Sequence, residues 1–128
     1  MGKEKENIEK LAIEIKDFLN LHELDFDIAI YFNSKILDKM GKKDWELIEN
    51  VLPSTFTKYA NDETITLIFE GPFYGMINFS WTNLEYRNEI DNKFRETLNK
   101  YGYYYEIGEA WNIALYKFGK THCVTIKK

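Results

Sequence analysis

Cysteine and histidine are nearly absent from this chain. Cys123 is the single cysteine among 128 residues, so no disulfide can form within the chain. His22 and His122 are the two histidines, and they stand far apart in the sequence, which gives no local spacing of metal ligands. His122 and Cys123 are adjacent and would point to opposite faces of a strand, which argues against a joint metal site or nucleophile pair. A pairing of Cys123 with His22 in the folded protein stays open.

Arginine and long apolar runs are also scarce. Only Arg87 and Arg95 among the 17 basic residues are arginines, and the formal net charge is −4. Because nucleic-acid binding draws mainly on Lys and Arg contacts to phosphate, we expect no direct binding of nucleic acid. No apolar run approaches the ~18 residues of a membrane span, and the charged first residues are unlike a signal peptide. We expect a cytoplasmic protein with no membrane contact.

Recognisable catalytic motifs are missing as well. The chain has no phosphate-binding glycine loop, no nucleophile elbow and no zinc-protease helix motif. Asp25 and Asp27 alternate with apolar residues and could form a two-carboxylate metal or acid–base pair, but a solvated strand face explains them more simply. We therefore predict a protein that is not an enzyme, with no catalytic residues, no bound metal and no cofactor.

Aromatic residues, in contrast, are abundant. Nine Phe, nine Tyr and three Trp are more rings than the core of a small domain is expected to enclose, so some of them should lie on the surface. They concentrate in residues 101–111, where alternation puts Tyr103 and Tyr105 on one face of a strand and Tyr104 on the other. Such rings can form a binding surface, or they can be ordinary cross-strand tyrosine pairs on a sheet.

The periodicity of the apolar residues predicts the secondary structure. Helical spacing indicates amphipathic helices over about residues 4–22 and 84–101, the second between an Asn83 N-cap and a Gly102 C-cap. Residues 73–79 are expected to form a packed loop or an irregular turn, and Gly108-Glu109 a two-residue turn. The strands predicted by alternation and turn signals are 25–33, 35–39, 45–51, 64–70, 103–107, 111–117 and an edge strand at 121–126.

These elements predict an α+β fold for residues 1–128, taken as a single domain. We expect a single antiparallel sheet of five to seven strands, with the two main helices packed on it. In the strand at 25–33, alternation places Tyr31 on the face opposite to the core.

The function that fits this composition is non-catalytic binding through a protein–protein interface. Residues 25–70 carry nine acids against five lysines, so this part could dock onto a basic partner, including a nucleic-acid-binding protein. In size and composition the chain is similar to small inhibitors of phages and mobile elements, such as anti-CRISPR proteins, and to toxin-immunity proteins. The candidate partner-binding residues are Tyr31, Trp45, Tyr74, Tyr104 and Tyr116, with Asp25, Asp27, Asp62 and Glu63 as electrostatic guides.

Three alternatives stay open from the sequence. The first is a small-molecule or nucleotide-binding protein with a tyrosine-lined cleft, in which Arg87 or lysines supply positive charge. The second is a hydrolase or nuclease built on Asp25 and Asp27. The third is a homodimer that associates through an open sheet edge or an aromatic face.

Overall fold

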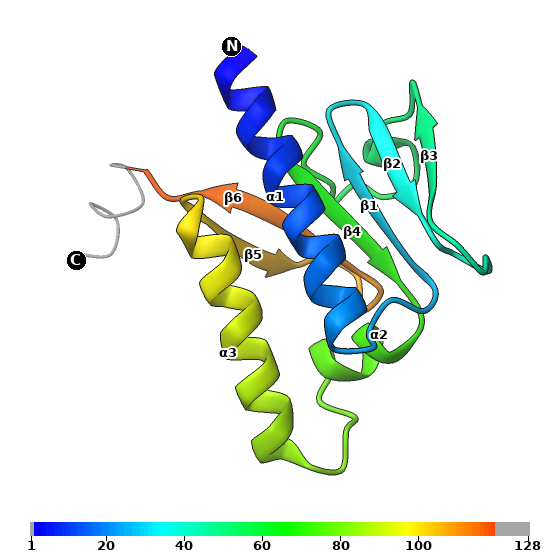
Figure 1. The fold of residues 1–128 in the computed structure, drawn as a ribbon, viewed down its shortest axis with the longest axis vertical. Coiled ribbons are helices and arrows are strands. Elements are labelled where there is room, and N and C mark those ends of the chain that lie inside the picture. The colour runs from blue at the N-terminus through cyan, green and yellow to red at the C-terminus, as the bar shows by residue number, and fades with distance from the viewer. Residues whose placement is uncertain (1, 120–128) are drawn as a thin grey trace.

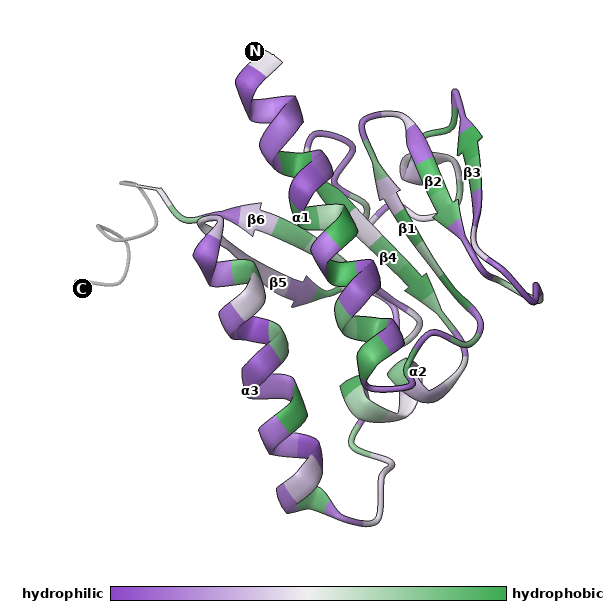
Figure 2. Ribbon diagram, viewed as in Figure 1, coloured by the Kyte–Doolittle hydropathy of each residue, from purple (hydrophilic) through white to green (hydrophobic). Residues whose placement is uncertain are grey.

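Two amphipathic helices cover one face of the protein's sheet. In the computed structural model, which describes residues 2–119, helix α1 (Gly2–Leu21) and helix α3 (Leu84–Lys100) lie side by side across the strands (Figure 1). Figure 2 shows apolar segments recurring along α1, as its helical spacing requires. The buried residues of α1 are Ile8, Leu11, Ala12, Ile15, Phe18 and Leu19.

The ends of α3 follow the predicted capping chemistry. The Asn83 side chain accepts a hydrogen bond from the backbone N–H of Tyr86 at 2.9 Å, which satisfies one of the unpaired donors of the first turn. Gly102 has a φ of +89°, a left-handed conformation that glycine adopts without a steric cost. The helix at 84–101 is therefore confirmed to within one residue.

Within residues 2–119, six antiparallel strands form a single sheet, which confirms the predicted α+β fold. The strand order is β3-β2-β1-β4-β6-β5, and every neighbouring pair is antiparallel. The predicted edge strand at 121–126 lies outside the described residues. The strands are β1 (Ile28–Phe32), β2 (Lys35–Asp38), β3 (Glu46–Glu49), β4 (Ile65–Phe69), β5 (Tyr103–Ile107) and β6 (Asn112–Lys117).

The main core lies between the sheet and the two long helices. At its centre the ring of Phe73 meets Phe69 at 4.9 Å and Phe94 at 5.2 Å, both in edge-to-face geometry. Edge-to-face rings add roughly 0.5–1.5 kcal/mol to the stabilisation that comes from burying them. Tyr103 and Tyr105 point into this core, as their alternation predicts.

The connection between β3 and β4 covers part of the opposite face. This segment, residues 50–64, contains one 3-10 turn (Pro53–Thr55) and crosses a second cluster of Ala29, Tyr31 and Ile36. The Nδ2 of Asn61 and the hydroxyl of Thr64 both donate to the carbonyl of Leu115, which fastens the segment to β6. We call residues 50–64 the covering segment.

Two local predictions are wrong. Residues 72–77 form a short helix, α2 (Pro72–Ile77), rather than a loop, because Pro72 has the φ that suits a first helical position. The turn between β5 and β6 spans residues 108–111 rather than two residues. It is longer because the buried Asn112 closes it: its Oδ1 accepts from the N–H of Glu109 at 2.7 Å.

Candidate functional site

Tyr31 is buried, so the prediction that it lies on an exposed face is wrong. Its side of β1 was assigned correctly, but only 6% of its surface is accessible. The covering segment lies over it, and the ring of Phe56 stands 6.0 Å from the Tyr31 ring. Burial raises the pKa of Tyr31, because the phenolate would lose its solvation.

Trp45 has a structural contact that accounts for its position. It directly precedes β3 and is partly buried against the main core. Its indole Nε1 donates to the side-chain oxygen of Asn20 in α1 at 3.0 Å. Trp45 therefore joins the β2–β3 hairpin to the end of α1.

Tyr104 and Tyr116 form a cross-strand pair on β5 and β6. Their ring centroids are 6.1 Å apart, and Tyr104 also lies 5.1 Å from the ring of Phe118. Partial burial raises the pKa of both tyrosines. Tyr74 belongs to α2 and is exposed, so the candidate tyrosines do not share one surface.

Asp25 and Asp27 do not share a strand face, which corrects the prediction for residues 25–33. The strand starts at Ile28, because Asp27 has a φ of +53° that breaks the alternation before it. Asp25 forms an ion pair with Lys39, and the Asp27 carboxylate accepts from the N–H of Gly41 at 2.8 Å. Both carboxylates therefore fix the loop before β1 to the β2–β3 hairpin.

Asp62 and Glu63 lie at the end of the covering segment. Asp62 accepts hydrogen bonds from the backbone N–H of Ser54 at 3.1 Å and from its hydroxyl at 2.6 Å. Both carboxylate oxygens are therefore used in bonds within the covering segment. Glu63 is exposed. Together with Glu4 and Lys5 they line an open crevice of about 370 Å³.

Both arginines belong to a polar network on α3. The buried Asp91 carboxylate accepts from Arg95 Nε at 2.8 Å and from the Tyr105 hydroxyl at 2.8 Å, with Arg87 3.8 Å away. Arg87 also donates to the carbonyl of Met76 at 2.6 Å. Burial and the hydrogen bond to Asp91 raise the pKa of Tyr105. Arg87 thus has internal partners, which removes it as a ready cation for a nucleotide.

The most exposed group of apolar side chains on α3 and its approach was not singled out by sequence reasoning. We call this group the aromatic surface: Phe79, Trp81, Leu84 and Tyr86, in the α2–α3 connection and the first turn of α3. Helical spacing with Ile90, Phe94 and Leu98 would place Tyr86 on the buried stripe of the helix, but 46% of its surface is accessible. The wrong assignment arose because the stripe begins with Arg87, whose hydrogen bonds occupy the inward position instead.

Trp81 is positioned by α2. The N–H of Ser80 donates to the carbonyl of Gly75 at 2.9 Å, which folds the connection back along the short helix. A Cβ on Gly75 would stand 2.9 Å from the indole Nε1 of Trp81, so the absent side chain leaves the room that the indole occupies. The Trp81 ring then stacks on Tyr86, with centroids 5.8 Å apart and planes inclined by 18°.

The Phe79 ring packs against Arg87, which belongs to the polar network around Asp91. The ring lies 3.7 Å from the Arg87 guanidinium carbon, a cation–π contact, and 59% of the surface of Phe79 is accessible. Its φ of +59° is unusual for an aromatic residue and costs on the order of 1 kcal/mol. A signal existed in the sequence: Phe79 and Trp81 precede the Asn83 cap, outside the apolar stripe of any helix.

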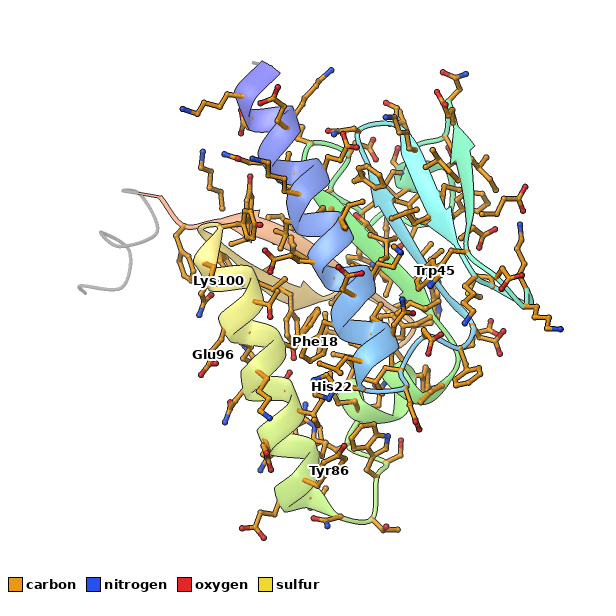
Figure 3. All side chains as sticks on the ribbon, viewed as in Figure 1. Phe18, His22, Trp45, Tyr86, Glu96 and Lys100 are labelled. Carbon is orange, nitrogen blue, oxygen red and sulfur yellow. The ribbon has the colours of Figure 1, made fainter. Side chains whose placement is uncertain are left out.

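The stacked pair borders a hollow at the surface. Trp81, Thr82, Asn83 and Tyr86 line about 330 Å³ of space that opens to solvent. Figure 3 shows Tyr86 on the first turns of α3, at the same end of the molecule as His22, which directly follows α1. A hollow of this size suits one or two side chains of a bound molecule.

A larger groove separates α1 from the end of α3. About 630 Å³ is lined by Glu6, Glu9, Ile13 and Tyr101, with Lys10 and Glu14. Glu14 accepts from Lys100 at 2.8 Å and from the Tyr101 hydroxyl at 2.6 Å, and both contacts lower its pKa. The Glu14 carboxylate in the groove is therefore already paired with groups of the chain itself.

No protein-family model, curated protein or solved structure matches this chain. Within residues 2–119, no group of three or more His, Cys, Asp or Glu side chains is placed to hold a metal ion. None of the helices in the described part of the chain is long and apolar enough to cross a membrane. Cys123 and His122 lie outside that part, so their relation to His22 stays a prediction.

Proposed function

We propose that this chain is a non-catalytic protein-binding domain that docks through the aromatic surface of Phe79, Trp81, Leu84 and Tyr86. The observation that carries the proposal is the stacked Trp81–Tyr86 pair at a surface hollow. Two neighbours in the sequence, Phe79 and Leu84, are half exposed or more. Aromatic side chains at the centre of a patch are the usual anchors of protein–protein interfaces. Contiguous exposed apolar side chains mark interaction sites in soluble proteins.

The rigidity of this surface favours binding. The Asn83 cap fixes the first turn of α3, Gly75 seats Trp81, and the buried Arg87 supports Phe79 from below. A preorganised surface loses less conformational entropy when a partner binds. An inhibitor of a larger protein, of the anti-CRISPR or toxin-immunity type, is one role that such a domain would fill.

Site-specific cross-linking tests the proposal. A photoreactive phenylalanine derivative replaces Tyr86 in the native host, and its matched control replaces Tyr59, which is similarly exposed at 43% but lies on the covering segment. We expect a single stoichiometric protein adduct from position 86 and none from position 59. Equal adducts from both positions, or none from position 86, would contradict the proposal.

Affinity measurements on the partner captured in that experiment give the second test. Truncating Tyr86 to alanine is expected to weaken binding by more than about 1 kcal/mol, as anchor residues do. The same truncation of Tyr59 should change the affinity little. An adduct composed of two copies of this chain would identify the partner as a second molecule of the protein.

A further inference from the structure

We propose that the hollow beside Trp81 and Tyr86 receives a lysine or arginine side chain from a basic segment of the partner protein. This inference rests on the proposed function and names the chemistry of the partner. The occupant is a cationic segment of a protein, and its recognition combines cation–π contact with attraction to nearby carboxylates.

Three exposed rings of the chain, one of them Phe79 of the aromatic surface, already lie against a cation of the chain itself. Lys39 lies over Phe26 at 5.3 Å, Lys58 over Tyr59 at 5.3 Å and Arg87 over Phe79 at 3.7 Å. No cation of residues 2–119 lies over Trp81 or Tyr86 in the same way. Tryptophan has the strongest attraction for a cation among the aromatic side chains, so this pair is well suited to one from another molecule.

The charges around the hollow favour a cation over an anion. Residues 79–88, which include the four residues that line the hollow, carry one acid, Glu85, and one basic residue, Arg87, which is buried and bound to the carbonyl of Met76. Glu85 is exposed next to Tyr86 and has no ion-pair partner among the described side chains. Its carboxylate also offsets the partial positive charge at the start of α3, which would otherwise attract an anion.

The nearest lysine on the helix is already engaged. Lys93 pairs with Glu89 at 3.5 Å one turn further along α3. It is therefore not positioned to occupy the rings, and it does not cancel the charge of Glu85. A cationic side chain from another molecule meets the stacked Trp81–Tyr86 pair, with the unpaired Glu85 carboxylate next to Tyr86 in the sequence of α3.

The hollow can also engage the backbone of an extended segment. The indole Nε1–H of Trp81 and the hydroxyl of Thr82 make no hydrogen bond within the part of the chain that the structure describes. Asn83 uses its side-chain oxygen for the cap, which leaves its amide N–H groups available. These donors can bind peptide carbonyls on either side of the inserted cation.

Two matched peptides test the inference by NMR. One short peptide alternates glycine with arginine, and the other alternates glycine with glutamate. We expect the indole N–H resonance of Trp81 to shift saturably with the arginine peptide and not with the glutamate peptide. The indole of Trp45, which is bonded to Asn20, serves as an internal control and should stay in place.

Substitutions separate ring recognition from general attraction. Tyr86→Leu keeps the apolar area of the side chain but removes the ring. It should lower the affinity for the arginine peptide roughly three- to thirtyfold. Glu85→Gln should also lower this affinity and make it less dependent on salt concentration. Tyr59→Leu should have no effect. Circular dichroism verifies that each variant is folded, which we expect because all three positions are exposed.

Several results would overturn the inference. They are an unmoved Trp81 resonance, equal shifts with the glutamate peptide, an equal shift at Trp45, or unchanged binding by Tyr86→Leu. If a protein adduct forms at position 86 while the arginine peptide leaves Trp81 unmoved, the docking surface stands and its cationic occupant is refuted. If the arginine peptide binds but no protein adduct forms, the proposed function fails by itself.

Discussion

At the scale of single residues, the Asp91 carboxylate stands out among the described side chains because it lies between Arg87, Arg95 and Tyr105. It is buried and accepts hydrogen bonds from Arg95 and Tyr105, with Arg87 close by. A buried carboxylate is tolerated only when its partners compensate the lost solvation. Removing it leaves the Arg87 charge and the Tyr105 hydroxyl without this acceptor.

We expect Asp91→Ala to lower the free energy of unfolding by about 3 kcal/mol, because removing one member of a buried ion pair strands the others. Urea denaturation followed by circular dichroism measures the change. Glu89→Ala is the control on the same helix, since the Glu89–Lys93 pair is exposed and should contribute less than about 1 kcal/mol. Similar losses for the two variants would show that the network is not a stabilising unit.

A pH effect is expected at Glu14. Lys100 and Tyr101 lower its pKa below the ordinary value of 4.5, so the contact stabilises the fold above about pH 4.5 and is lost as the pH falls through the lowered pKa. The side chain is more than one-third exposed, so the effect is a few tenths of a kcal/mol. Glu14→Gln should flatten the fall in the free energy of unfolding below pH 4.5. If the free energy of unfolding falls with pH equally steeply in the variant, Glu14 is not the source of the effect.

At the scale of elements, α2 shows why short helices escape sequence reasoning. Its six residues are too few for an apolar period to appear, and the glycines before it and within it suggest a loop. The glycines have packing roles instead. A Cβ on Gly71 would stand 2.2 Å from the carbonyl oxygen of Phe26, and one on Gly75 would meet the Trp81 indole.

Alanine at these two positions should have different effects. Gly71→Ala forces backbone apart and should cost about 1–3 kcal/mol in the free energy of unfolding. Gly75→Ala meets a side chain that can turn, so its stability cost should be smaller. It should instead displace Trp81 from Tyr86, seen as a moved indole N–H resonance. A larger stability loss at Gly75 than at Gly71 would contradict this account of α2.

The strands and long helices could be predicted because their periods run over several turns or residue pairs. Alternation correctly put Tyr103 and Tyr105 on one face of β5 and Tyr104 on the other, and the Asn83 cap located the start of α3. Alternation also gave the correct side for Tyr31, but it says nothing about a loop that later covers that side. The aromatic surface escaped for a similar reason: Trp81 and Tyr86 meet through the fold of a connection, not through a repeat.

At the scale of the whole molecule, the rings are divided between the core and the surface. Seven of the 21 aromatic side chains are exposed, which agrees with the expectation that the interior cannot enclose them all. They are spread over several elements rather than gathered on the tyrosine-rich hairpin. The helix-covered face holds most of the buried rings, so the two faces of the sheet contribute unequally to stability.

Matched truncations on the two faces measure this asymmetry. Phe73→Ala removes a fully buried ring beneath the helices and should cost about 3–5 kcal/mol. Phe56→Ala removes a mostly exposed ring on the covering segment and should cost less than about 1 kcal/mol. Thermal or urea unfolding compares them. Equal costs would mean that the covering segment is as much a core element as the helices.

The covering segment has a practical consequence for work on this protein. It is one segment of chain over Ala29, Tyr31 and Ile36. A tag or loop inserted there would displace it and expose an apolar surface of the sheet that is prone to aggregation. The tip of the β2–β3 hairpin, residues 41–44, is exposed at every position and lies on a different part of the chain. Fluorophores and affinity handles belong at that tip, where they leave both the sheet and the Trp81–Tyr86 pair undisturbed.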